Sequence, residues 1–357
     1  MKISIVRGAF LDPSEIQNYS PLKGEFDIQA ISSKNPVSDK VDIPLKKLWS
    51  PSDLPLFLNK ILIGHDKLFG LSKVIKASDV VHVSNIYSGF THQVIMAKRR
   101  GEIRKIVATV SETIPNNNLR KRGSMQSIRY VHENIDKYIA VTKKAKDALI
   151  KEGVSEGKVE VIRLGVDLHR FKPSQKKDNK RIVRILCVAQ LIPEKGILDL
   201  VEAFYEIYKN NKNIWLTFVG DGPLKSDLKG YKNISLKTIP YNQIHREYQS
   251  SDIYCLPSRV TKNWEEKYAM SLVESMASGL PIITSDSGGS SDICGTSALY
   301  IKPGNVIDLQ KKLEYLITNP DIRKSMGKAS RALAEKECDR IKIAKRIGEV
   351  YKSLIYR

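Results

Sequence analysis

Glu266 and Glu274 stand with seven residues between them, in a stretch that runs from 252 to 292. This stretch holds a short apolar strand pattern, a polar loop with Glu266, a helical pattern with Glu274, and a second strand pattern that leads to Gly288-Gly289. A helix that follows a strand presents unpaired N–H groups and a partial positive charge, which suit a phosphate. Carboxylates beside it can accept hydrogen bonds from sugar hydroxyls. We therefore expect a site for a nucleotide sugar.

The bare spacing of two glutamates is common, and by itself it indicates only a solvated helix face. Here the surrounding residues add a motif, formed by Pro257, Ser258, Glu266, Tyr268, Ala269, Glu274, Met276, Ala277, Gly279, Pro281, Ile282, Ile283, Gly288 and Gly289. This run resembles the donor-binding signature of the family 4 retaining glycosyltransferases. The resemblance implies the GT-B architecture, an α/β fold in which two Rossmann-like domains face each other across a donor-binding cleft.

A second motif lies earlier, where an apolar strand pattern runs into the segment 190–196, QLIPEKG. It is similar to the family's G-R-L-x-x-E-K-G turn, in which an arginine and a lysine bind the donor diphosphate. Lys195 matches the lysine, whereas Gln190 replaces the arginine and adds no charge. The resemblance implies that Lys195 is the main neutralising side chain. Arg259 is a candidate second cation if its loop folds inward.

The same resemblance assigns roles to the residues around the helix. Glu266 is expected to bind donor-sugar hydroxyls and Glu274 the nucleotide ribose, while backbone N–H groups of Tyr268, Ala269 and Met270 bind the sugar. Ala269 stands where glycine is usual in the family.

Breaking a sugar-diphosphate bond requires stabilisation of the departing negative charge. The sequence contains no Asp-x-Asp metal motif, so we expect a metal-independent reaction without a cofactor. Lys195 and the helix N-terminus near Met270 and Ser271 would supply the positive charge instead.

Two candidates come from the first half of the chain. Gly8 follows the first predicted strand, where related enzymes carry paired glycines close to the diphosphate. Ser111 stands where many family members have a histidine, and the neighbouring Glu112 is a candidate to meet an acceptor hydroxyl; a helix-capping or loop role is the alternative. His82 ends a strand pattern and is expected to be packed rather than catalytic.

The length of 357 residues suits two α/β domains. We expect an acceptor domain over 1–173, a polar linker over 174–181, a nucleotide-sugar domain over 182–340, and a last helix, 341–357, that returns to the first domain. Within the first domain, the pattern predicts a helix over 54–76.

The formal net charge of +20 is concentrated in the first half of the chain. It indicates either contact with an anionic membrane surface or an ordinary solvated surface. Nucleic acid is not an expected partner, because no recognised nucleic-acid-binding motif is present. The four scattered cysteines indicate a reduced, cytoplasmic protein, peripheral to the cytoplasmic membrane face if the basic surface contacts lipid.

These features favour a retaining hexosyltransferase that moves a hexose from a nucleotide-diphosphate sugar to a lipid-linked or polysaccharide acceptor. The alternatives are another GT-B activity such as a phosphorylase or an epimerase, a non-catalytic sugar-nucleotide-binding subunit, which Gln190 and Ser111 favour, and a basic nucleic-acid binder.

Overall fold

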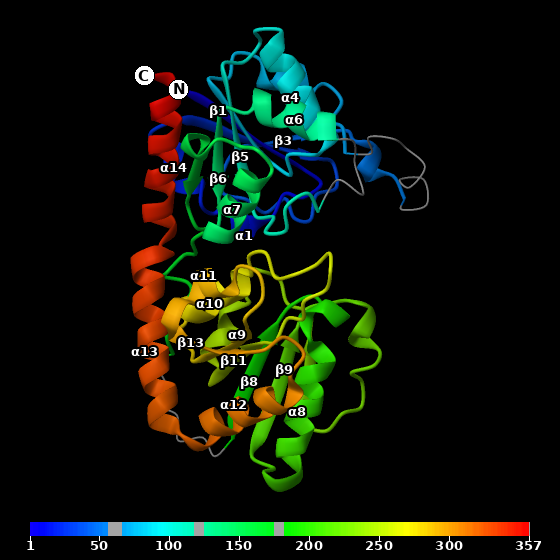
Figure 1. The fold of residues 1–357 in the computed structure, drawn as a ribbon, viewed down its shortest axis with the longest axis vertical. Coiled ribbons are helices and arrows are strands. Elements are labelled where there is room, and N and C mark those ends of the chain that lie inside the picture. Colours follow the sequence, from blue (N-terminus) through cyan, green and yellow to red (C-terminus); the bar gives the residue numbers. More distant parts are fainter. Residues whose placement is uncertain (56–65, 118–124, 175–181, 357) are drawn as a thin grey trace. The chain divides into compact units, whose positions relative to one another are not determined.

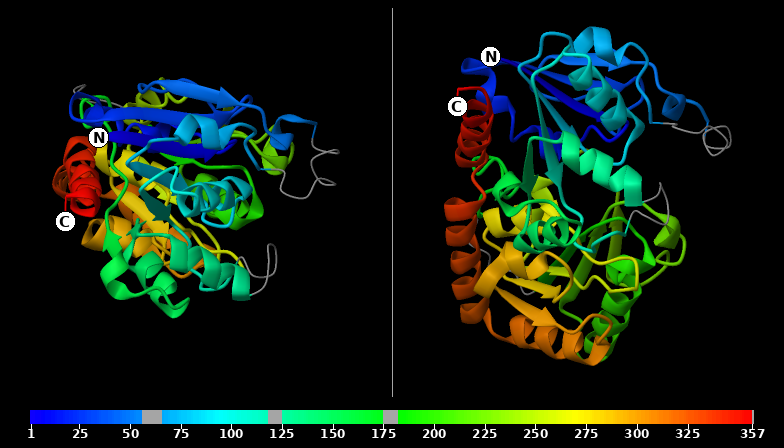
Figure 2. Two further views of the ribbon diagram at one scale, coloured as in Figure 1. Left: turned by 90° about the horizontal axis from the view of Figure 1, so that it is seen from above. Right: turned by 45° about the horizontal axis from the view of Figure 1, so that its top comes forward.

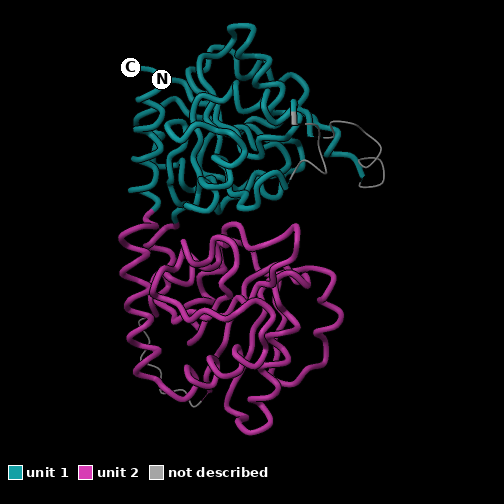
Figure 3. Tube along the Cα trace, in the orientation of Figure 1, with its two compact units in different colours: residues 1–165, 340–357 teal, residues 166–339 magenta. Residues whose placement is uncertain are grey.

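The chain divides into two compact units, residues 1–165 together with 340–357, and residues 166–339 (Figure 3). The expected linker lies at 174–181, and its residues 175–181 fall outside the described part of the chain. The structure is a computed structural model that describes residues 1–55, 66–117, 125–174 and 182–356.

The first unit is built on a parallel sheet of seven strands in the order β3-β2-β1-β4-β5-β6-β7. All of its strands end at one edge, and the order reverses between β1 and β4, which is where open α/β sheets bind ligands. The strands are β1 (Lys2–Gly8), β2 (Asp27–Ser33), β3 (Leu45–Leu48), β4 (Val80–Ser84), β5 (Lys105–Val110), β6 (Lys137–Ala140) and β7 (Val159–Val161).

Helices cover both faces of this sheet (Figures 1 and 2). Side chains alternate between the two cores: Ile5 of β1 packs with α14, whereas Val6 packs with α4. One face carries α3 (Leu71–Ile75), α4 (Gly89–Arg99), α6 (Met125–Asn134) and α7 (Lys143–Lys151), and the other carries α1 (Pro13–Ile16), the 3₁₀ turn η1 (Ser20–Gly24) and α14 (Arg340–Ile355).

The helix expected over 54–76 is wrong for most of its described residues. Among the described residues of 54–76, only α3, Leu71–Ile75, is helical, and Asp66, Phe69 and Gly70 lie in turns. Gly70 precedes α3 with φ of +81°, a left-handed conformation that interrupts a helix. Residues 56–65 lie outside the described part of the chain.

The second unit has a parallel sheet of six strands in the order β10-β9-β8-β11-β12-β13. Its strands are β8 (Val183–Val188), β9 (Ile214–Val219), β10 (Ile234–Lys237), β11 (Ile253–Leu256), β12 (Ile282–Ser285) and β13 (Ala298–Ile301). Its helices are α8 (Ile197–Asn210), α9 (His245–Gln249), α10 (Met270–Ala277), α11 (Ser290–Cys294), α12 (Val306–Thr318) and α13 (Pro320–Glu337).

All four cysteines are buried thiols. Burial raises the pKa of the Cys187 thiol to about 12, so it stays protonated at neutral pH. In the described ranges, no helix combines the length and the apolar character needed to cross a membrane.

Helices α10 and α13 approach each other where Gly327 of α13 faces Gly279, which follows α10. A Cβ atom on Gly327 would lie 2.2 Å from the Gly279 carbonyl oxygen. This distance is far shorter than any normal contact, so the packing of the two helices requires glycine at position 327.

We predict that Gly327→Ala lowers the free energy of unfolding by about 1–3 kcal/mol, because overpacking outweighs the roughly 1 kcal/mol gain in helix propensity. Chemical denaturation or calorimetry measures the change. The control is Gly157→Ala, because a Cβ atom there would meet nothing within 4 Å. Equal stability of the two variants would contradict the prediction.

Candidate active site

The candidate residues of the second unit lie where β8, β11 and β12 end. These strands are neighbours in a parallel sheet, so the segments that follow them meet at one edge. Lys195 ends the 3₁₀ turn η4 (Pro193–Lys195) after β8, and Glu266 lies in the loop between β11 and α10. The turn after β12 carries Gly288.

Lys195 and Glu266 form an ion pair. The Nζ atom of Lys195 lies 2.9 Å from Oε1 and 2.7 Å from Oε2 of Glu266, and the Ser258 hydroxyl donates to Oε2 at 2.7 Å. The Lys195 side chain is 16% exposed and that of Glu266 is 5% exposed. The Lys195 ammonium also lies 5.3 Å from the ring centre of Trp264. A nearly buried carboxylate is therefore compensated by a cation that still reaches solvent.

Close backbone contacts hold this pair in place. A Cβ atom on Gly288 would lie 1.9 Å from the Glu266 carbonyl oxygen, and the Gly289 N–H donates to that oxygen at 2.7 Å. A Cβ atom on Gly196, which has φ of +66°, would lie 2.0 Å from the carbonyl oxygen of Pro257. The two glycine positions thus allow the turns after β8 and β12 to close on the loop after β11.

Glu274 lies on α10 and is 3% exposed. The Tyr248 hydroxyl donates a hydrogen bond of 2.7 Å to its Oε2 atom. Burial, followed by the charge of Glu274, raises the pKa of Tyr248 well above its usual value, so the phenol keeps its proton and remains a donor. Sequence reasoning missed Tyr248 because it belongs to α9, outside the motif.

The α10 N-terminus begins at Met270, with Ala269 as its N-cap residue. Ala269 is 7% exposed and supplies no capping hydrogen bond from its side chain. The first amide groups of the helix, including those of Met270 and Ser271, are thus without a capping side chain. Tyr268 precedes them and is half-buried.

Arg259 and Gln190 differ from Lys195 in their surroundings. The Arg259 N–H donates to the Glu194 carbonyl at 2.8 Å, which keeps its loop beside the Lys195 turn. Its guanidinium, however, forms a two-point pair with Asp199 of α8, with 2.8 Å between Nε and Oδ2. Gln190 is exposed just after β8. The proposed compensation by Arg259 stays a prediction, and in this structure Asp199 already balances its charge.

The remaining candidates belong to the first unit. Gly8 is the last residue of β1 and has φ of +58°. Glu112 follows β5, and its Oε1 atom lies 3.4 Å from both the Ile114 amide nitrogen and the Asn117 side-chain nitrogen. These contacts fit the loop role that was the alternative for Glu112.

Two family profiles match adjoining parts of the chain: Glycosyltransferase Family 4 over residues 37–170, and Glycosyl transferases group 1 over residues 169–333. The chain belongs to glycosyltransferase family 4. This confirms the family predicted from the motifs around Lys195, Glu266 and Glu274.

One solved structure and two curated proteins illustrate the similarity. The Anabaena protein HepE in complex with UDP and glucose has a TM-score of 0.77 at 15% identity, covering 99% of this chain and 100% of that one. The predicted GT-B fold class, with its two Rossmann-like units, is therefore confirmed. An Escherichia coli UDP-Gal:alpha-D-GlcNAc-diphosphoundecaprenol alpha-1,3-galactosyltransferase is 29% identical over 306 residues, which are 77% of this chain and 75% of that protein.

The Arabidopsis thaliana sulfoquinovosyl transferase SQD2 is 26% identical over 248 residues, 64% of this chain. The match spans only 47% of the plant protein. The matches to two further curated relatives likewise cover less than two thirds of those proteins.

We predict that Tyr248→Phe lowers the free energy of unfolding by about 1–3 kcal/mol, because the buried Glu274 carboxylate loses a donor. Denaturant titration measures this loss. Tyr315→Phe is the matched control, since Tyr315 is 45% exposed on α12. An unchanged stability of Tyr248→Phe would show that the hydrogen bond does not support Glu274.

Proposed function

We propose that this chain is a retaining, metal-independent hexosyltransferase that uses a nucleotide-diphosphate sugar as donor and a lipid-linked or glycan acceptor. The observation that carries the proposal is the meeting of Lys195 and Glu266 at the strand ends of the second unit, beside the α10 helix that holds Glu274. Family membership supports the donor class.

Lys195 and the α10 N-terminus are the groups that would stabilise the departing diphosphate. A lysine ammonium offers three rotatable donors, and a helix N-terminus adds N–H groups and a partial positive charge. Fixed donors of this kind stabilise charge as it develops in the transition state without a cost of reorganisation. In this role they take the place that a metal ion has in other transferases.

Donor binding would exchange the partners of Lys195. In this structure its ammonium contacts both carboxylate oxygens of Glu266. A diphosphate competes for the same ammonium, and the carboxylate then turns to the donor-sugar hydroxyls while Ser258 continues to donate to it. Glu274, held by Tyr248, would meet the nucleotide ribose.

The proposed acceptor class is supported by the similarity to a sequence relative and by the net positive charge of the chain. The name of the Escherichia coli relative specifies a diphosphoundecaprenol-linked sugar as that protein's acceptor. The net charge of +20 suits an anionic lipid surface or a phosphorylated acceptor. We therefore place the activity in cell-envelope glycan synthesis, at the cytoplasmic face of the membrane.

A second candidate function is a non-catalytic subunit that binds sugar nucleotides. Gln190 adds no charge, and Asp199 balances Arg259. Both features reduce the positive charge available to a leaving diphosphate. Such a subunit would bind the donor without transferring or hydrolysing it.

Selective binding of one nucleotide is the first expected result. Thermal shifts are measured with UDP, GDP, ADP, dTDP and their sugar conjugates, in EDTA and in magnesium. One nucleotide should stabilise the protein in EDTA by roughly 2.7 kcal/mol at a hundredfold excess over Kd. Glu274→Ala should abolish the effect, whereas Lys232→Ala, at an exposed residue, should keep it. A shift that requires magnesium would contradict metal independence, and no shift with any nucleotide would contradict the donor site.

Turnover of the selected nucleotide sugar separates the two candidate functions. Lys195→Ala should lower kcat by roughly 10²–10³-fold, the scale seen when one fixed donor to a developing charge is removed. Product analysis by NMR should show retention of the anomeric configuration. Inversion would refute the retaining mechanism, and tight binding by wild type without any turnover would favour the non-catalytic subunit.

A further inference from the structure

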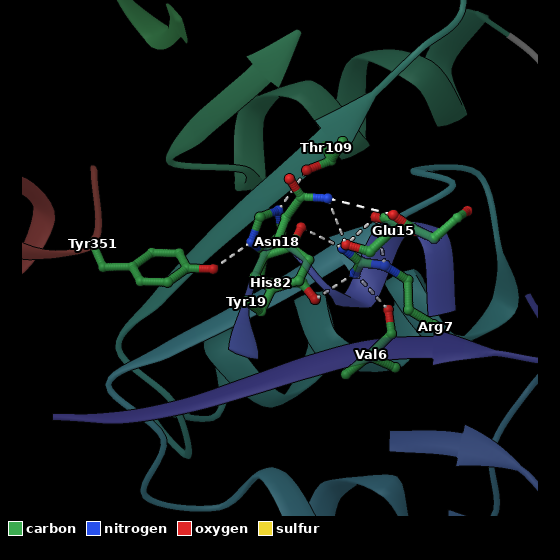
Figure 4. A network of polar contacts seen from close by, with 9 residues as sticks. Val6, Arg7, Glu15, Asn18, Tyr19, His82, Thr109 and Tyr351 are labelled. Atoms are coloured by element: carbon green, nitrogen blue, oxygen red, sulfur yellow. Dashed lines mark hydrogen bonds and ion pairs between the residues drawn. The ribbon is translucent and has the colours of Figure 1, made fainter. Parts of the chain in front are cut away.

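Arg7 is a fully buried cation whose N–H groups are all engaged (Figure 4). Its Nε and Nη2 atoms lie 2.9 and 2.7 Å from Oε1 of Glu15, and Nη2 also donates to the Tyr19 hydroxyl at 2.8 Å. The Nη1 atom donates to the carbonyl oxygens of Val6 and His82, each at 3.1 Å. Because a guanidinium has a rigid fork of donors, these contacts fix Arg7 in one orientation.

His82 continues the network from β4. Its Nδ1 atom lies 2.6 Å from the Tyr351 hydroxyl of α14, and its Nε2 atom lies 2.8 Å from Oγ1 of Thr109 in β5. Burial, together with the charge of Arg7, places the pKa of His82 well below its usual value. The neutral ring therefore has one N–H donor and one acceptor nitrogen for its two hydroxyl partners. The hydrogen bond from Nη1 of Arg7 to the His82 carbonyl oxygen joins the two halves of the network.

The network occupies a particular part of the sheet. Arg7, His82 and Thr109 come from the neighbouring strands β1, β4 and β5, on the face that α14 covers, close to the edge where the strands end. Gly8 comes directly after Arg7, and Ser111 follows Thr109 by two residues. Gly8 ends β1 and starts the segment 8–12, and Ser111 starts the loop 111–117; both carry predicted substrate-site residues.

Burying polar and charged side chains in a core has a desolvation cost. Apolar side chains of similar volume often stabilise a core as well as a buried ion pair does, or better. Buried polar groups that are fully hydrogen bonded instead fix a single geometry, because each bond is directional. The arrangement around Arg7 and His82 thus suits exact placement of the strand ends better than it suits stability alone.

We infer that Tyr351 of α14 is a positioning residue, which holds the loops 8–12 and 111–117 through His82, Thr109 and Arg7. Its partner His82 lies 269 residues earlier in the sequence. The inference rests on the proposed function, because these loops hold the expected contact of Gly8 with the donor diphosphate and of Glu112 with the acceptor. Tyr351 and His82 are fully buried, so they act on substrates only through the loops.

Hydrogen–deuterium exchange of the full-length protein tests the coupling without any ligand. Tyr351→Phe and Thr109→Val each remove one hydroxyl, and both should increase exchange in 8–12 and 111–117 while leaving α4 unchanged. Thr109→Ser keeps the hydroxyl and should behave as wild type. Tyr356→Phe is the control next to α14, because Tyr356 is 74% exposed. Unchanged loops in Tyr351→Phe, or a uniform increase over the whole unit, would overturn the inference.

Turnover supplies the second readout, with the nucleotide sugar that stabilises wild type and at a temperature well below unfolding. Tyr351→Phe and Thr109→Val should lower kcat by roughly tenfold to a hundredfold, since small misplacements of reacting groups have effects of this size. Faster loop exchange with an unchanged kcat would reduce the network to a structural role and overturn the inference. If no nucleotide stabilises wild type, the proposed function fails, and loop exchange alone decides whether Tyr351 holds the loops.

Discussion

The ion pair between Lys195 and Glu266 is the interaction on which the second unit's site depends. A carboxylate that is 5% exposed needs a compensating charge, and the lysine comes from a different βα turn. The two turns can meet only because glycine stands where backbones touch, at Gly196 and Gly288. The parallel order of β8, β11 and β12 brings all three turns to one edge. The ion pair between Lys195 and Glu266 thus requires both the sheet topology and the glycines at the close backbone contacts.

Both units carry an ion pair of a cation and a carboxylate near the strand ends. The two pairs differ in burial, and therefore in how easily the cation can exchange its partner. Arg7 is 0% exposed, and its N–H groups are all engaged within the protein, so exchanging its partners would leave buried groups unsatisfied. Lys195 is 16% exposed, and an ammonium can rotate its donors toward a new partner at small cost. The first pair suits a fixed framework, and the second suits exchange with an anionic ligand.

The sequence predicted local features well, because the relevant residues are neighbours in it. The short strand pattern expected early in the stretch 252–292 is β11, and the helical pattern with Glu274 is α10, which ends before Gly279. The expectation that His82 is packed is confirmed by its complete burial and by its two side-chain partners. Tyr248 and Tyr351 could not be found in this way, since their partners are distant in sequence and hydrogen bonds across such distances leave no periodic pattern. Within the described part of 54–76, the left-handed Gly70 interrupts the expected helix just before α3.

The charge balance around Lys195 suggests a reason why the diphosphate and the sugar of a nucleotide-sugar donor would be bound together. Asp199 pairs with Arg259 as Glu266 pairs with Lys195, and Gln190 is uncharged, so a diphosphate at Lys195 would compete for an ammonium that Glu266 now holds. When the diphosphate takes that charge, Glu266 keeps only the Ser258 hydroxyl among the two side-chain partners it has now. A buried carboxylate in that state is costly unless new donors reach it. Sugar hydroxyls are such donors, and they are joined covalently to the diphosphate that displaced the lysine. In the proposed reaction, binding of the diphosphate and binding of the sugar would therefore depend on each other through the Lys195 ammonium group.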